Sequence, residues 1–173
     1  MVLRVLLVAD THGALDARVE ALAGECQYVV HAGDIGSAAV LDRLARGGKL
    51  VAVRGNNDVA HKWPVHEQTA IDRLPEQERV ALPGGALIVI HGHQCARARS
   101  RHTVLRRRFP DARVIVYGHT HRAVCDNTVD PWVLNPGAAG RTRTFGGASC
   151  MILEVEAGDW RVRAHRFDRR DAS

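Results

Sequence analysis

Residues 2–12 read VLRVLLVADTH, so an almost unbroken apolar run ends directly in Asp10 and His12. A run of this kind is typical of a strand that is buried on both faces, as in a parallel sheet. In the first half of the chain, similar runs rich in Val, Ile and Leu alternate with amphipathic stretches. That alternation indicates βαβ units, and therefore an α/β fold with a largely parallel sheet.

The same patterns predict further elements along the chain. Strands are expected at 2–9, 28–30, 50–53, 113–117, 132–134, 149–155 and 160–167, and a hairpin is expected from 79–82 and 86–90. Helical spacing occurs at Leu15, Val19 and Leu22, across 37–46, and in the basic segment 97–109. Residues 63–74 show no clear pattern.

Length and composition predict an ordinary globular protein. The 173 residues are enough for one well-packed domain, and we expect 1–173 to form it. Hydrophobic residues make up 46% and charged residues 25% of the chain, so disorder is not expected. No apolar run approaches the roughly 20 residues needed to cross a bilayer, so no membrane contact is expected. The four cysteines include no C-x-x-C pair, which indicates reduced thiols and a cytoplasmic protein.

The chain is basic, with a net charge of +5. Many of its arginines fall in 97–108 and in 161–170. A solvated helix face and a polar tail are one explanation for them. Attraction of anionic substrates, nucleic acid included, is the other, although the chain leaves no room for a separate DNA-binding domain.

Five of the predicted apolar strands run straight into side chains of the kind that bind metal ions. These candidate ligands are Asp10, His12, Asp34, Asn56, His91, His119 and His121. Because the carboxyl ends of strands in an open α/β sheet form its binding edge, we expect the five loops to meet in one cleft. A single His after a strand is weak evidence for a site, but five such segments in one short chain are strong evidence. Glycines beside the ligands are explained either as ordinary turn residues or as points of close approach.

Carboxylates and imidazoles without a thiolate suit borderline divalent ions such as Mn, Fe, Co, Ni or Zn better than Ca or Mg. More than four ligands exceed what one tetrahedral ion needs. Two divalent transition-metal ions that share a carboxylate are therefore the simplest explanation, and Asp34 is the natural bridge.

These segments resemble the calcineurin-like metallophosphoesterases, whose pattern is D-x-H, G-D, G-N-H-[DE], H and G-H-x-H. The short length and the segments at 54–58, 91–93 and 134–137 look most like the small YfcE-like phosphodiesterase branch, to which VPS29 also belongs. The resemblance implies a layered sandwich of two packed mixed β-sheets flanked by helices. It further implies that Asp10, His12, Asp34 and His121 hold one ion, and that Asp34, Asn56, His91 and His119 hold the other. Mn is the first choice of metal, ahead of Ni, Co, Fe or Zn.

One departure from the family pattern concerns Asn57, which stands where many members carry a histidine that contacts the phosphate. We expect a hydroxide bridging the two ions to attack a phosphodiester. His93 and Asn57 would bind the substrate and donate hydrogen bonds to its developing charge, with His93 as the candidate catalytic residue. A purely structural or ligand-orienting role for His93 is the alternative.

Three functions remain open at this point. The intact ligand set favours a phosphodiesterase acting on a phosphate ester, which could be nucleotide-like. A nuclease acting on nucleic-acid ends or single strands is the second reading, since the basic segment could bind nucleic acid. A VPS29-like protein-binding scaffold with a residual metal site is the third. Assembly into a homo-oligomer is also left open.

Overall fold

Strand β1 (Leu3–Val8) lies at the centre of a five-stranded sheet with the order β10-β9-β1-β2-β3. It pairs in parallel with β2 (Tyr28–His31), which pairs in parallel with β3 (Lys49–Ala52), as the βαβαβ pattern predicts. On its other side β1 pairs antiparallel with β9 (Ala148–Glu156), and β9 forms a hairpin with β10 (Asp159–Phe167). The structure is a computed structural model that describes residues 2–95, 100–156 and 158–168.

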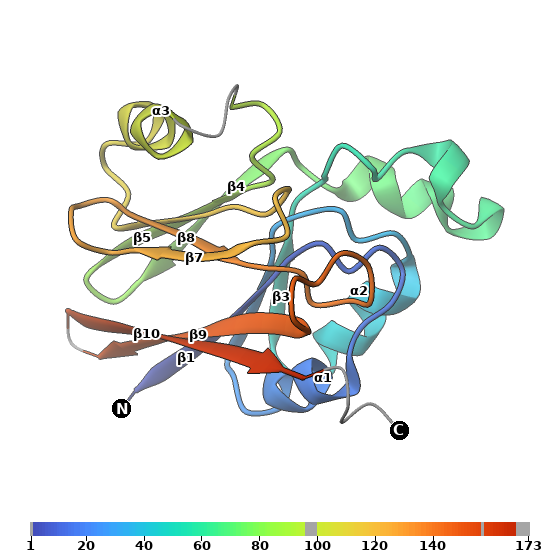
Figure 1. Ribbon diagram of the computed structural model, residues 1–173, viewed down its shortest axis with the longest axis horizontal. Helices are drawn as coiled ribbons and strands as arrows, with labels where there is room; N and C mark the ends of the chain where they lie inside the picture. Colours follow the sequence, from blue (N-terminus) through green and yellow to red (C-terminus); the bar gives the residue numbers. More distant parts are fainter. Residues whose placement is uncertain (1, 96–99, 157, 169–173) are drawn as a thin grey trace.

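The second sheet has the order β4-β5-β6-β8-β7. The predicted hairpin of β4 (Gln77–Leu82) and β5 (Gly85–Ile90) forms one edge. Strands β5, β6 (Val114–Val116) and β8 (Trp132–Pro136) run parallel, and β7 (Ala123–Asp126) pairs antiparallel with β8 at the other edge. The two sheets pack face to face with helices outside them, which confirms the predicted sandwich of mixed sheets (Figure 1).

Alternating side chains on the strands build three apolar layers. Along β1, Leu7 packs between the two sheets, whereas Leu6 packs on the helix side of its sheet. Along β5, Val89 packs between the sheets and Ile88 packs on the outer side, in the same cluster as Leu105. Because both faces of these strands are covered, they appear in the sequence as continuous apolar runs rather than as alternating ones.

Helices α1 (Ala17–Ala23) and α2 (Ala38–Ala45) lie against the first sheet, and α3 (Arg101–Arg108) lies beyond the second (Figure 1). Helix α1 begins after Asp16, whose carboxylate accepts a hydrogen bond from the backbone N–H of Arg18 at 2.9 Å. All three helices overlap the predicted segments, although residues 97–99 of the basic segment lie outside the described residues.

Two features were not predicted. Strand β7 is a short edge strand whose residues are only partly buried, so it lacks an apolar pattern. Two 3₁₀ helices follow β3, η1 (Ala60–Lys62) just before the unassigned region 63–74 and η2 (Val65–Arg73) within it, and Ile71 is the one buried residue in them. With so few buried positions, these turns leave no periodic signal in the sequence.

The parallel strands β1, β2 and β3 of one sheet, and β5 and β6 of the other, each lead into a loop that carries candidate ligands. The distances between these side chains, given below, place all five loops at one end of the sandwich. Among the described residues, no helix has the length and apolar character required to cross a membrane.

Candidate metal centre

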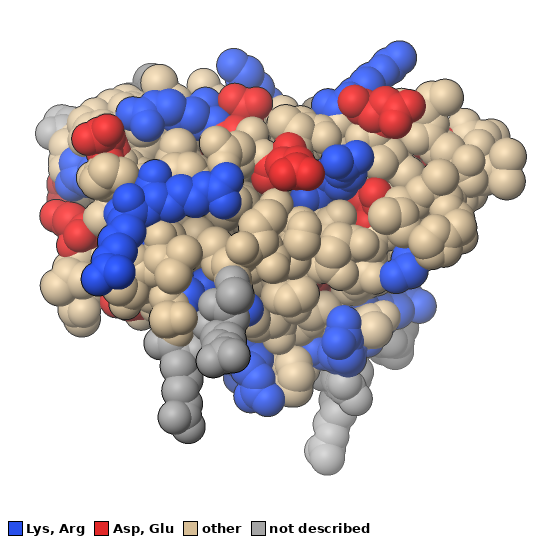
Figure 2. All heavy atoms as spheres, turned by 90° about the horizontal axis from the view of Figure 1, so that it is seen from above, with Lys and Arg blue, Asp and Glu red and all other residues tan. Residues whose placement is uncertain are grey.

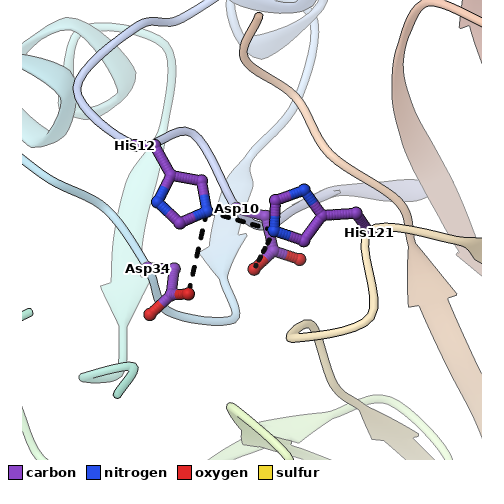
Figure 3. Close-up of side chains that lie close together, drawn as sticks. All are labelled: Asp10, His12, Asp34 and His121. Atoms are coloured by element: carbon purple, nitrogen blue, oxygen red, sulfur yellow. Dashed lines mark hydrogen bonds and ion pairs between the residues drawn. The ribbon is translucent and has the colours of Figure 1, made fainter. Parts of the chain in front are cut away.

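The first expected set of ligands forms a tight group of four side chains (Figure 3). The ligand atoms of Asp10, His12, Asp34 and His121 all lie within 4.8 Å of one another. The two imidazoles point at each other, with 3.1 Å between their Nε2 atoms. His12 Nε2 lies 3.7 Å from Asp34 Oδ2, and His121 Nε2 lies 3.6 Å from Asp10 Oδ1.

The second expected set gathers around the side-chain oxygen of Asn56. Its Oδ1 lies 3.1 Å from His91 Nε2 and 3.0 Å from His119 Nδ1. Asp34 Oδ1 lies 3.4 Å from His91 Nε2, so the two oxygens of Asp34 face different sets. All seven residues predicted as ligands are therefore brought to one place, and Asp34 stands between the two sets.

The backbone of this site is unusual. Five of the seven residues have a positive φ, an uncommon conformation for residues other than glycine: Asp10, His12, Asp34, His119 and His121. Residues held in such conformations each cost of order 1–3 kcal/mol and tend to cluster at functional sites. Their concentration here marks these loops as built for a particular arrangement of side chains.

Glycines allow the loops to approach closely. A Cβ atom at Gly55 would lie 2.2 Å from Asp34 Oδ1, and one at Gly33 would lie 2.7 Å from His91 Nδ1. Both contacts are too short for any side chain, so these two glycines have a role beyond that of ordinary turn residues.

The second nitrogens of two histidines are fixed by backbone carbonyls. His91 Nδ1 lies 2.7 Å from the carbonyl oxygen of Ala32, and His121 Nδ1 lies 3.0 Å from that of Thr142. A carbonyl only accepts hydrogen bonds, so each Nδ1 carries a proton, and when the ring is neutral its Nε2 has a lone pair directed into the site. This is the usual way in which proteins orient histidines that bind metals.

Asp58, which follows the candidate ligand Asn56 and the candidate substrate-binding residue Asn57, holds the ligand loops together. Its Oδ1 accepts hydrogen bonds from the backbone N–H of Ile35 at 2.9 Å and from the indole of Trp63 at 3.1 Å, and its Oδ2 accepts from the N–H of Gly55 at 2.8 Å. The carboxylate is 1% exposed. It therefore fixes the loop after β2 against the loop after β3.

His31 is not one of the candidate ligands, and it is fully buried beneath the first ligand loop. Its Nδ1 accepts from the N–H of Gly33 at 3.2 Å, so its Nε2 donates to Thr11 Oγ1 at 2.9 Å. Thr11 in turn donates to the carbonyl of Ile35 at 2.9 Å. Burial lowers the pKa of His31 to about 3, which keeps this chain of bonds in its neutral form.

The two buried carboxylates of the site, Asp34 and Asp10, differ in how well their negative charges are stabilised. Burial opposes ionisation of Asp34, but hydrogen bonds and charge from His91 together with Asn57 hold its pKa well below the ordinary value. Burial also opposes protonation of His91, yet Asp34 and then Asp10 raise its pKa above the ordinary value. Asp10 lacks comparable support, and burial raises its pKa to about 7.

The residues fit divalent metal ions. Asp10 Oδ2 is a buried oxygen without a hydrogen-bond partner among the described residues, which is costly unless a cation or donor faces it. Imidazole nitrogens, carboxylate oxygens and one amide oxygen form the donor set that suits Mn, Fe, Co, Ni or Zn. A positive ion held by the first ligand set would satisfy Asp10 Oδ2.

The two residues expected to bind substrate lie beside the ligands. Asn57 donates from its side chain to Asp34 Oδ2 at 2.6 Å, and its backbone N–H donates to Asp34 Oδ1 at 2.8 Å. Its carbonyl oxygen accepts from Lys62. The ring of His93 is exposed and its centroid lies 5.4 Å from that of His91. Both side chains can reach a group bound next to Asp34 and His91.

A pocket of about 370 Å³ opens next to the first ligand set, lined by His12, Gly36, Asn57, Lys62, Thr142 and Arg143. Sequence reasoning did not single out Lys62 or Arg143, because neither belongs to a motif: Lys62 ends the short helix η1, and Arg143 lies in the loop after β8. A larger hollow of about 580 Å³ lies between β3 and β4 and includes none of the candidate ligands, so size alone does not mark the site.

The geometry defines a metal-binding centre at the carboxyl ends of the strands of an α/β sandwich. The family model for the calcineurin-like phosphoesterase superfamily domain matches residues 3–158. The chain therefore belongs to this superfamily, as its motifs predicted, and the family is one of metal-dependent phosphoesterases.

Similar proteins of known sequence or structure are consistent with membership of this superfamily. A phosphodiesterase of Methanocaldococcus jannaschii, MJ0936, is 27% identical over 92% of this chain and 97% of its own length. The structure of Vps29 from Entamoeba histolytica complexed with zinc superimposes with a TM-score of 0.74 at 20% identity, over 96% of this chain and 99% of that one. An archaeal phosphodiesterase superimposes with a TM-score of 0.69 at 22% identity, over 94% of this chain and 100% of that one. The two structures establish the shared fold.

We predict that Asp10→Asn stabilises the protein in the presence of a chelator. The pKa of Asp10 in the folded chain, about 7, lies above the ordinary value of 3.8, so wild type loses stability as pH rises from about 4 to 7. The amide does not ionise and should add about 1–3 kcal/mol to the free energy of unfolding at pH 8, with a smaller gain at pH 5. Urea denaturation measures both values, and the exposed Asp111→Asn serves as the control. A gain that does not depend on pH would contradict this account of Asp10.

We also predict that bound metal is lost in two steps as pH falls, because a histidine must be neutral to bind a metal ion. The pKa of His91 is raised above its ordinary value by Asp34 and Asp10, so this ring protonates first as pH falls. Burial lowers the pKa of His12 and of His121, and lowers the pKa of His119 to about 4. These three rings therefore stay neutral at a pH at which His91 is already protonated. Equilibrium dialysis with Mn²⁺ from pH 8 to pH 4 should show one ion lost before the other. His91→Ala should abolish only the step at higher pH. Loss of both ions in a single step in wild type would contradict the claim that His91 protonates before the other ligands.

Proposed function

We propose that this protein is a phosphodiesterase that holds two divalent metal ions, with Mn²⁺ as the first choice and Ni, Co, Fe or Zn as alternatives. One ion would be held by Asp10, His12, Asp34 and His121, and the other by Asp34, Asn56, His91 and His119. The observation that carries the proposal is the position of Asp34, whose Oδ2 faces His12 at 3.7 Å while its Oδ1 faces His91 at 3.4 Å.

Bound at these ligands, two ions would lower the pKa of a coordinated water and offset negative charge on the phosphoryl group. The chain itself supplies the positioning. His91 and His121 are fixed by carbonyl oxygens, so their Nε2 atoms keep one direction. His93 and the second amide hydrogen of Asn57 would donate hydrogen bonds to the substrate, because neither has a hydrogen-bond partner among the described residues. The name of the M. jannaschii relative supports a diester as the substrate.

The basic helix gives little support to a nuclease. Arg106 pairs with Asp126 at 2.8 Å, Arg108 donates to Gln77 at 2.7 Å, and the Arg101 guanidinium lies over the Tyr117 ring at 5.6 Å. On the face seen from above, Lys and Arg are interspersed with Asp and Glu rather than gathered in one patch (Figure 2). These contacts favour a structural role for Arg101, Arg106 and Arg108 of α3.

The function is tested by activity with Mn²⁺, Ni²⁺, Co²⁺, Zn²⁺ and Mg²⁺ against bis(p-nitrophenyl) phosphate, p-nitrophenyl phosphate and single-stranded DNA. We expect the diester to be the best substrate. Asp34→Asn should reduce turnover of the diester by at least about 100-fold and lower the metal content below two ions per chain, because Asp34 serves both sets. Asp111→Asn is the matched control at an exposed position. Two ions per chain and unchanged turnover in Asp34→Asn would refute the role of Asp34.

Asn57 generates a second prediction, because an amide cannot act as a general acid near neutral pH. The wild-type rate should therefore fall steeply as the pKa of the leaving alcohol rises. Asn57→His could restore proton donation, a gain of about 10² to 10⁴ that should be largest for poor leaving groups. A series of diesters that differ only in alcohol pKa measures the slope for wild type, Asn57→His and Asn57→Ala. Equal slopes for folded, metal-loaded wild type and Asn57→His would contradict this account of Asn57, because either His93 already acts as the acid or protonation does not limit the reaction.

A further inference from the structure

The pocket beside the first ligand set has the composition of an anion site. Two of its six lining residues, Lys62 and Arg143, are cations, and none is a carboxylate. Its volume of about 370 Å³ lies within the range of small-ligand pockets, so it can hold a group larger than one phosphoryl oxygen. Lys with Arg is a combination that proteins use to bind phosphate.

Lys62 is placed next to the reaction centre by Asn57. Its ammonium donates to the side-chain oxygen of Asn57, whose amide nitrogen donates to Asp34 Oδ2 at 2.6 Å. An ammonium has three hydrogens, and Asn57 is its one hydrogen-bond partner among the described residues. Donors of Lys62 therefore remain for a ligand close to Asp34.

Arg143, the second cation of the pocket, is held in place by His121. Its Nη2 lies 3.1 Å from His121 Nε2, and the Nδ1–H of His121 is occupied by the carbonyl of Thr142. The single lone pair on His121 Nε2 therefore accepts from Arg143 or binds a metal ion, but not both. When His121 serves as a metal ligand, the guanidinium N–H is released beside the pocket that Lys62 also lines.

Asn57 cannot donate a proton to the leaving group of the reacting phosphate, because an amide is not a general acid near neutral pH. A leaving group that departs as a stable anion does not need one, and a phosphate monoester is such a group, since its second pKa is about 6. Two cations next to the metal centre would stabilise the charge that a departing phosphate gains. The amide of Asn57 and the two cations Lys62 and Arg143 thus both favour a substrate whose leaving group is a phosphate monoester.

We propose that Lys62 and Arg143 form a phosphate subsite for the leaving group, and that the preferred substrates are diesters of diphosphate, R–O–PO₂–O–PO₂–O–R′. This inference rests on the proposed phosphodiesterase function and names its substrate class. Water forms a bond to one phosphorus as the bond from that phosphorus to the bridging oxygen breaks. The bonding pair stays on the bridging oxygen, which leaves as part of the second phosphate monoester. The products are two phosphate monoesters, and two protons pass to solvent.

The kinetic test compares diadenosine 5′,5′-diphosphate, whose leaving group is AMP, with bis(p-nitrophenyl) phosphate, whose leaving group is an aryl oxide. The ratio of the two kcat/KM values is measured with Mn²⁺ for wild type, Lys62→Met, Arg143→Met and the control Arg141→Met. Arg141 lies in the same loop as Arg143, is exposed, and does not line the pocket. We expect the ratio to fall about tenfold in each pocket variant, as for loss of one charge-assisted hydrogen bond, and to stay within twofold in the control.

A binding measurement provides a readout that does not depend on turnover. Calorimetric titration of the Mn²⁺-loaded proteins with AMP and with adenosine gives the contribution of the phosphate to binding. Because all variants carry the same metals, a difference between their Kd values for AMP measures the contribution of Lys62 or Arg143 to phosphate binding. The Kd for AMP should rise about tenfold in Lys62→Met and in Arg143→Met, and hardly change in Arg141→Met.

Each outcome counts for or against the subsite. If wild type cleaves the aryl diester but not the diphosphate diester, or if AMP binding is equal in all four proteins, the subsite is wrong while the phosphodiesterase function stands. If wild type cleaves neither substrate yet the pocket variants lose AMP binding, the proposed function fails and the phosphate subsite remains. A loss of metal content in a pocket variant would assign that residue to the metal centre and overturn its role as a subsite.

Discussion

The carboxylate of Asp34 is the feature on which the rest of the centre depends. It is 1% exposed, and it nevertheless stays ionised because His91 and Asn57 surround it with hydrogen bonds. An unsupported buried carboxylate would become neutral, and a neutral acid could not hold two cations. The glycine at position 55 is part of the same constraint, because any side chain there would collide with Asp34. Burial, charge and backbone shape thus all act on one residue.

The site is costly to the fold. Five ligands have positive φ, Asp10 carries a raised pKa, and its Oδ2 has no partner among the described residues. These features persist because the three apolar layers and the bonds of Asp58 and His31 hold the loops in place. Bound metal would relieve part of this unfavourable charge, so binding and stability are coupled. Such coupling explains why a protein can keep strained loops at the ends of otherwise regular strands.

Much of this arrangement could be predicted from the sequence, because ligand-type residues follow buried strands and strand direction decides where they meet. The seven candidate ligands were found in this way, whereas the sandwich of two sheets was implied by the resemblance to the calcineurin-like family. The roles of Asp58, Lys62 and Arg143 could not be, since they depend on how the irregular segments after β3 and β8 fold. Strand β7 and the 3₁₀ helices were missed for a related reason, as few of their residues are buried. The structure also separates His31, whose buried ring supports two loops, from the histidines that face the centre.

The central claim is that Asp34 is shared by two ions. Anomalous diffraction at the Mn absorption edge, from crystals grown with Mn²⁺, tests this most directly. Two peaks are predicted, one on each side of the Asp34 carboxylate, the first in contact with His12 and His121 and the second in contact with His91 and His119. A single peak, or two peaks of which only one lies within bonding distance of Asp34, would contradict it.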